Sequence, residues 1–168
     1  INVSGFIHAW KAQWYDGVIS IISFICTLAF APHLDKGIMV GVGLSLIVFL
    51  YKSTRPTVAR LAMHEDLALK NAEAYSLNEC GYVAAIRFDG PLFFANASYL
   101  EDKVTEIMQT RLELKHILIV GDGINDMDAS GEEALSLLVD RVRSAGCGIS
   151  FAELKENVIA VMKRTHLW

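Results

Sequence analysis

The hydrophobic residues are concentrated in two uncharged segments in the first third of the chain. Residues 17–32 and 37–51 contain no charged side chain, and only four residues, 33–36, separate them. Apolar segments of this length that lack a polar face are typical of helices that cross a membrane. Each is slightly shorter than the roughly 17 to 25 residues of a membrane span, so we expect flanking residues to extend them. We therefore predict a membrane helical hairpin, with short apolar helices at about 17–34 and 37–51.

The charged residues around this hairpin predict its orientation. The loop inside the hairpin offers only Lys36 beside Asp35. The cations outside it are Lys11, Lys52, Arg55 and Arg60. Because lysine and arginine are enriched on the cytoplasmic side of membrane segments, both ends of the hairpin are expected in the cytoplasm. The sequence thus predicts a multi-pass protein of the cell (inner) membrane.

The rest of the chain alternates between short strand patterns and helical patterns. Strands are expected over 82–88, 92–94, 116–120 and 148–151, and helices over 99–112, from Ser130 onward, and over 153–163. Such alternation indicates an α/β sandwich with a partly parallel sheet. Residues before the first strand read as a polar, partly helical connector. The predicted division is a membrane region at 1–56, a connector at 57–79 and an α/β domain at 80–168.

Composition and charge exclude several classes of function. Hydrophobic residues make up 53% of the 168 residues and the net charge is −4, with +3 in residues 1–63 and −7 in the remainder. An acidic soluble part argues against nucleic-acid binding, which needs a cationic surface. The three cysteines, Cys26, Cys80 and Cys147, show no metal-ligand spacing. We therefore expect no nucleic-acid partner, no metal and no cofactor.

The most distinctive polar segment is 121–135, GDGINDMDASGEEAL, which follows the strand pattern at 116–120. Ser130 and Glu133 have the spacing of a capping box, which predicts a helix that begins at Ser130. The turn would bring one hydroxyl and several carboxylates to one edge of the sheet. We interpret the aspartates as turn and cap residues rather than metal ligands. They are Asp122, Asp126 and Asp128.

Part of this segment, GDGIND, resembles the Mg-binding loop of haloacid-dehalogenase-type phosphatases and P-type ATPases. That resemblance implies two aspartates holding Mg²⁺ beside a phosphorylated aspartate. The chemistry also requires a nucleophilic aspartate in a motif such as DKTGT. The nearest string, Asp-Lys-Gly at 35–37, lacks the threonine. A fragment of a Mg-dependent phosphatase or P-type ATPase is therefore kept as the alternative function.

A second resemblance accounts for more of the chain. Residues 128–131, Asp-Ala-Ser-Gly, resemble the D-x-S-G turn of the STAS domain (sulfate transporter and anti-sigma-factor antagonist). Residues 92–97, LFFANA, are similar to the segment before the first helix of STAS domains in transporters. These motifs follow an apolar hairpin that ends in YKSTRP at 51–56. In this order, essentially the whole chain resembles the carboxyl-terminal part of a SulP-family (sulfate permease type) anion transporter, with its last two membrane segments and its STAS domain.

This resemblance implies a function for the chain and for the turn. The chain would be a fragment of a secondary anion transporter for sulfate, bicarbonate or a related anion, with a cytoplasmic STAS domain that acts in dimerisation or regulation and no enzymatic activity. Asp128, Ser130 and Gly131 would form a regulatory or partner-binding site, in which Ser130 is either an N-cap or a phosphorylation site. Implied partners are the remaining membrane domain, the lipid bilayer, a second copy and acyl carrier protein. The chain also stops before the last strand and helix of a STAS domain, so we expect a truncated carboxyl end.

Overall fold

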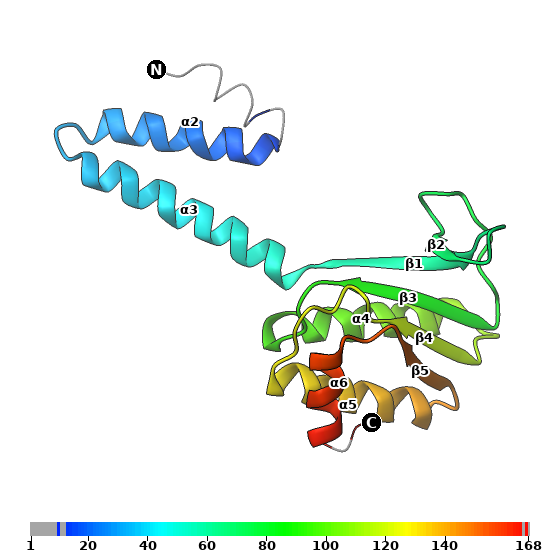
Figure 1. Ribbon diagram of the computed structural model, residues 1–168. Helices are drawn as coiled ribbons and strands as arrows, with labels where there is room; N and C mark the ends of the chain where they lie inside the picture. Colours follow the sequence, from blue (N-terminus) through cyan, green and yellow to red (C-terminus); the bar gives the residue numbers. More distant parts are fainter. Residues whose placement is uncertain (1–9, 11–12, 166, 168) are drawn as a thin grey trace. The chain divides into compact units, whose positions relative to one another are not determined.

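The structure is a computed structural model that describes Trp10, residues 13–165 and Leu167. It divides into two compact units, Ile1–Lys52 and Ser53–Trp168 (Figure 1). The described part of the first unit is helical, whereas the second unit contains a sheet and helices.

Two consecutive helices form where the sequence predicts a hairpin. They are α2 (Trp14–Ala29) and α3 (Leu34–Thr54). The predicted extension of the first helix to residue 34 is wrong, because Pro32 lacks a backbone N–H and Leu34 instead begins the second helix. The prediction that both segments are short is also wrong for α3. Among the described residues, α3 is the one helix that is long and apolar enough to cross a membrane, while the apolar part of α2 is shorter.

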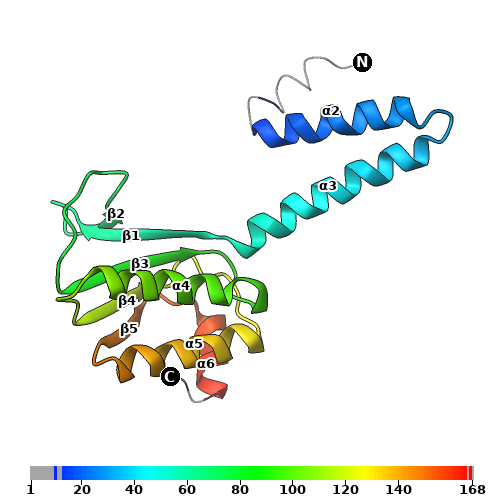
Figure 2. The same ribbon diagram turned by 180° about the vertical axis from the view of Figure 1, so that it is seen from behind.

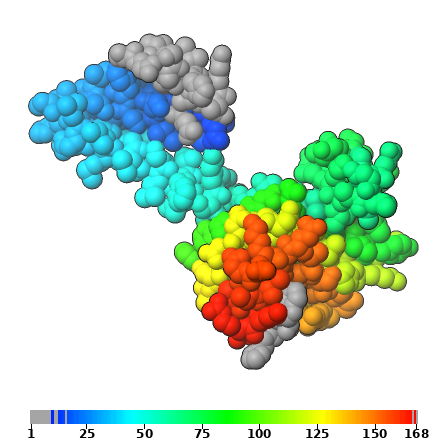
Figure 3. Space-filling model, viewed as in Figure 1, coloured from blue at the N-terminus to red at the C-terminus, as the bar shows by residue number. Residues whose placement is uncertain are grey.

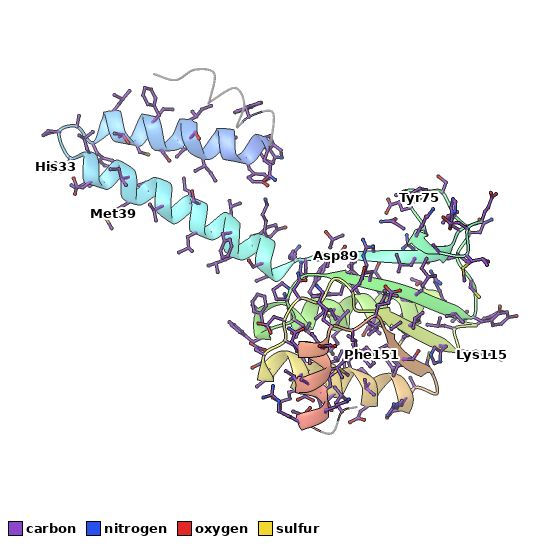
Figure 4. All side chains as sticks on the ribbon, in the orientation of Figure 1. His33, Met39, Tyr75, Asp89, Lys115 and Phe151 are labelled. Carbon is purple, nitrogen blue, oxygen red and sulfur yellow. The ribbon has the colours of Figure 1, made fainter. Side chains whose placement is uncertain are left out.

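Small residues allow α2 and α3 to pack closely. A Cβ atom built on Gly37 would lie 2.5 Å from Cα of Thr27, and one on Gly41 would lie 2.6 Å from Oγ of Ser23. At Gly37 the contact is with backbone, so a side chain there would push the two helices apart, whereas at Gly41 the Ser23 hydroxyl would have to turn away. Large apolar side chains elsewhere on α3 are exposed, as Met39 is (Figure 4). A helix that is apolar on nearly all sides is suited to surroundings of lipid or of other helices.

The second unit contains a five-stranded mixed sheet with the order β2-β1-β3-β4-β5. The strands are β1 (Thr57–Met63), β2 (Leu69–Asn71), β3 (Val83–Asp89), β4 (His116–Val120) and β5 (Gly148–Ala152). β1 is antiparallel to β2 and β3, whereas β3, β4 and β5 are parallel. The helices α4 (Phe94–Thr110), α5 (Ala129–Ser144) and α6 (Glu156–Arg164) lie on one side of the sheet (Figures 1 and 2). The predicted α/β class with a partly parallel sheet is confirmed.

Three local predictions in this unit are wrong. Residues 57–79, expected to be a partly helical connector, supply β1 and β2 to the sheet. The expected strand at 92–94 is a single bridge between Leu92 and Met127, and α4 begins at Phe94. The last helix begins at residue 156 rather than 153, because Glu153 has a φ of 55° and is not helical.

Strand alternation places the main core between the sheet and the helices. Ile86 and Phe88 on β3 and Ile117 and Ile119 on β4 are all fully buried. They pack with inward residues of the helices, including Leu100, Val104, Leu135, Leu138, Val142, Val158 and Met162. A smaller buried cluster lies on the other face of the sheet and consists of Ala59, Leu61, Ala85 and Val120. In the space-filling view, α6 (red) forms part of the surface of this unit (Figure 3).

Candidate functional site

The candidate site lies where β3 and β4 end, at the loops that lead into α4 and α5. Because the two strands are parallel, both loops emerge at the same edge of the sheet. Backbone hydrogen bonds join them: the Leu92 N–H donates to the Asp126 carbonyl at 2.8 Å, and the Asp128 N–H donates to the Leu92 carbonyl at 3.2 Å. A further bond joins Gly90 N–H to the Gly123 carbonyl at 3.0 Å. The predicted turn is therefore one half of a two-loop structure.

Asp128 is the N-cap of α5. Its Oδ1 accepts a hydrogen bond from the Gly131 N–H at 2.6 Å, and its backbone is extended. The carboxylate satisfies a helix N–H that would otherwise have no partner and complements the positive end of the helix dipole. The predicted N-cap at Ser130 and its capping box with Glu133 are wrong, because α5 begins one residue earlier, at Ala129.

Gly131 allows the first turn of α5 to contact the β3–α4 loop. A Cβ atom at this position would lie 2.4 Å from the Leu92 carbonyl oxygen and 2.8 Å from its carbonyl carbon. These are backbone atoms that the hydrogen bonds described above hold in place. A side chain at position 131 would therefore push the two loops apart, which explains the glycine of the D-x-S-G turn.

Ser130 itself is exposed and contributes to one face of α5. Ser130, Glu133 and Leu137 are three and four residues apart, so they share a side of the helix. Leu137 is 60% exposed. This face, termed the α5 face below, combines a hydroxyl near a helix N-terminus with an apolar side chain two turns later.

The other aspartates of the turn have separate partners. Oδ1 of Asp126 accepts a hydrogen bond from the Met127 N–H at 2.9 Å. Oδ1 of Asp122 lies 4.0 Å from Nε of Arg87. That guanidinium also donates to both oxygens of Asp89, at 2.8 and 3.2 Å (Figure 4). The hydrogen bonds to Asp89 raise the pKa of Arg87. Within the described part of the chain, no three potential metal-ligating side chains come together.

Asn96 is a residue of this site that sequence reasoning missed. Its side chain is 1% exposed. Its Oδ1 accepts from the Phe93 N–H at 3.0 Å, and its Nδ2 donates to the Pro91 carbonyl at 2.8 Å. These bonds hold the start of α4 against the loop that contacts Gly131. An asparagine three residues after the N-cap can satisfy the N-cap backbone in this way, and the LFFANA string contained that signal.

Comparison with known proteins identifies the family of this fold. A family model for the STAS domain matches residues 73–167, more than half of the chain. The chain is 24% identical over 181 residues to the probable sulfate transporter 4.2 of Arabidopsis thaliana, covering 98% of this chain and 26% of that protein. It is 25% identical over 174 residues to the chloroplastic sulfate transporter 4.1 of the same plant, covering 95% and 25% respectively. The chain thus spans about a quarter of the length of these relatives.

A solved structure with the same fold agrees with this result. The murine Solute Carrier 26 family member A9 anion transporter in its inward-facing state matches 94% of this chain and 26% of its own chain, with a TM-score of 0.77 and 23% identity. The alternative function, a Mg-dependent phosphatase or P-type ATPase, gains no support from these matches. The relatives are transporters, which are not enzymes. The chain therefore belongs to the STAS domain family, and its relatives are SulP-type sulfate transporters.

Proposed function

We propose that this chain is the carboxyl-terminal part of a secondary anion transporter that carries sulfate, bicarbonate or a related anion. In this proposal α2 and α3 are its last membrane segments, and residues 53–168 are a STAS domain in the cytoplasm. The observation that carries the proposal is the continuous match to sulfate transporters across both units, over 98% of the chain. The two apolar helices precede the STAS region in the chain, in the order expected for such a transporter.

The chain alone is not expected to move an anion. Two helices cannot enclose a pathway, and anion sites in such transporters lie between helices of both structural repeats. The exposed apolar surface of α3 would instead pack against the remaining membrane domain and lipid. We assign the chain no catalytic role.

Flotation with liposomes tests the membrane assignment. The full chain is expected to float with the lipid, whereas a fragment of residues 53–168 is expected to remain in the aqueous fraction and to fold. Both proteins carry the same STAS domain, so any difference arises from the two helices. A full chain that stays in the aqueous fraction as a monomer would show that the hairpin is not a membrane element.

Thiol labelling tests the orientation. Cys80 is exposed, Cys26 is partly buried within α2 and Cys147 is buried. In intact cells that contain the full-length transporter, we expect a membrane-impermeant maleimide to label Cys80 only after permeabilisation. A cysteine placed at His33, in the loop between the two helices, should react without permeabilisation. The opposite pattern would place the STAS domain outside the cytoplasm.

We also propose that the α5 face is the regulatory or partner-binding site, with Asp128, Ser130 and Gly131 at its beginning. A partner would bury Leu137, and a phosphate on Ser130 would add negative charge beside Asp128 and Glu133. The helix dipole favours that phosphate, but the neighbouring carboxylates repel it. Phosphorylation should therefore weaken binding of an acidic or apolar partner. The candidate partners are a second copy of the chain and acyl carrier protein.

Light scattering of the STAS fragment tests the first of these partners. If the α5 face forms a dimer, Leu137→Asp and Ser130→Asp should each shift the protein toward monomer, whereas Ser130→Ala should not. Titration with acyl carrier protein tests the second partner with the same variants. If neither association occurs, or if the variants leave both unchanged, the α5 face is not the binding site.

A further inference from the structure

A second concave site lies away from the α5 face, between β1 and α4. Its cavity has a volume of about 430 Å³. Val58 and Arg60 line it from β1, and Tyr99, Lys103 and Ile107 line it from α4. A pocket of this size falls within the range of small-molecule sites, which is about 300 to 1,000 Å³. The topology accounts for its position. α4 connects the parallel strands β3 and β4, and β1 pairs with the other side of β3.

Cationic side chains predominate in this cavity. Arg60 and Arg111 share a single carboxylate, that of Glu79, with Nη1 of Arg60 3.4 Å from Oε1. Nζ of Lys103 donates to Oε2 of Glu106 at 2.7 Å. Three cations therefore accompany two carboxylates, an excess of positive charge in a unit that carries 12 basic and 17 acidic residues.

Two of these cations are accessible to solvent. The side chain of Arg60 is 54% exposed and that of Lys103 is 37% exposed, whereas Arg111 is mostly covered. The hydrogen bond to Glu106 raises the pKa of Lys103, while the nearby positive charge of Arg60 lowers it. Arg60 and Lys103 both line this cavity, so a single anion bound there could accept charge-assisted hydrogen bonds from both.

Apart from the Thr110 hydroxyl, the remaining walls of the cavity are apolar or aromatic. Nζ of Lys103 lies 5.9 Å from the centroid of the Tyr99 ring, so the cation and the ring face the same space. Ile107 is buried and Val58 is half-buried beneath them. The cavity thus offers an anion-binding end and an adjacent apolar surface.

We infer that this cavity binds a small organic anion in which a phosphate or carboxylate is attached to a flat apolar group. The anionic group would bind between Arg60 and Lys103, and the apolar group would contact the Tyr99 ring and the side chains of Val58 and Ile107. Arg111 would serve as a positioning residue, because it holds the Glu79 carboxylate that also contacts Arg60.

Phenyl phosphate is a suitable probe. Inorganic phosphate and phenol, which carry only its charged group or only its ring, are the comparison compounds. Each compound is titrated into the full chain in detergent micelles, and amide NMR shifts of Tyr99 and Lys103 report binding at the cavity rather than in the micelle. Phenyl phosphate should bind at least about tenfold more tightly than either comparison compound, since two contact surfaces contribute. Equal affinities for phenyl phosphate and inorganic phosphate would overturn the inferred ligand class.

Charge-removing variants locate the site. Arg60→Gln and Lys103→Gln should each weaken phenyl phosphate binding by about tenfold or more, as expected for loss of a charge-assisted hydrogen bond. Lys115→Gln is the matched control, because Nζ of Lys115 lies 5.8 Å from the Tyr82 ring in a similar arrangement outside the cavity (Figure 4). Thermal unfolding of each variant identifies any change in folding. Unchanged affinity in a folded Lys103→Gln or Arg60→Gln variant would refute the inference.

Discussion

Replacing Gly131 with alanine places a methyl group against the backbone of the β3–α4 loop. The added Cβ would lie 2.4 Å from the Leu92 carbonyl oxygen, well inside the separation of two non-bonded heavy atoms. That oxygen also accepts the Asp128 N–H, and the Leu92 N–H donates to Asp126. Relief of the clash therefore requires α5 and the loop to separate, which lengthens both hydrogen bonds.

The expected magnitude follows from two opposing terms. Overpacking against a rigid neighbour costs about 1–3 kcal/mol, and a clash with backbone belongs to the upper part of that range. Alanine recovers at most about 1 kcal/mol through its higher helix propensity. The free energy of unfolding should fall by about 1–2 kcal/mol. For a unit of this size, that corresponds to a decrease in Tm of roughly 4–8 °C.

Urea and thermal unfolding of residues 53–168, followed by circular dichroism, measure this change. Gly81→Ala is the matched control, because a Cβ atom there meets no heavy atom within 4 Å and the glycine has an ordinary φ. The control should be neutral or slightly stabilising. If Gly131→Ala were as stable as Gly81→Ala, the close contact would not explain the glycine in this turn.

Three further predictions concern the second unit. Asp128→Ala should lower the free energy of unfolding by about 0.5–2 kcal/mol through loss of the N-cap, whereas Ser130→Ala should change it by less than about 0.5 kcal/mol in urea titrations. A fragment that begins at Asn71 lacks β1 and should show no cooperative unfolding transition, while one that keeps the strand should show one. The pKa of Asp66 is lowered from 3.8 to about 2, mainly by a hydrogen bond from Lys70. Because the folded-state pKa is depressed, the stabilising contribution of Asp66 should be complete above its unfolded pKa and disappear as the pH falls toward 2, and carboxyl NMR titration should give a midpoint near 2.

The sequence predicted the elements whose patterns were strong and local. The apolar runs at 17–32 and 37–51 and the β-branched strand at 116–120 all form the expected type of structure. β1 was missed because its mixture of small, charged and apolar residues gives a weak strand pattern by itself. The segment forms a strand through pairing with β2 and β3, and this pairing cannot be read from the local sequence. Residues 57–79 were therefore predicted to be a connector rather than part of the sheet.

The sequence correctly predicted a turn before a helix at 121–135, but not which residue caps that helix. Aspartate and serine are about equally favoured as N-caps, so sequence alone could not choose Asp128 over Ser130. The contact of Gly131 with Leu92 depends on the proximity of two loops that are joined only in three dimensions. The proposed regulatory role of Ser130 stays a prediction.

The junction between α3 and β1 contains only Arg55 and Pro56. Two residues span at most about 7 Å. The proline ring fixes one of their four backbone torsions, and the residue before a proline is restricted to extended conformations. The last residue of α3 and the first residue of β1 therefore stay close together whatever conformation the two linking residues adopt.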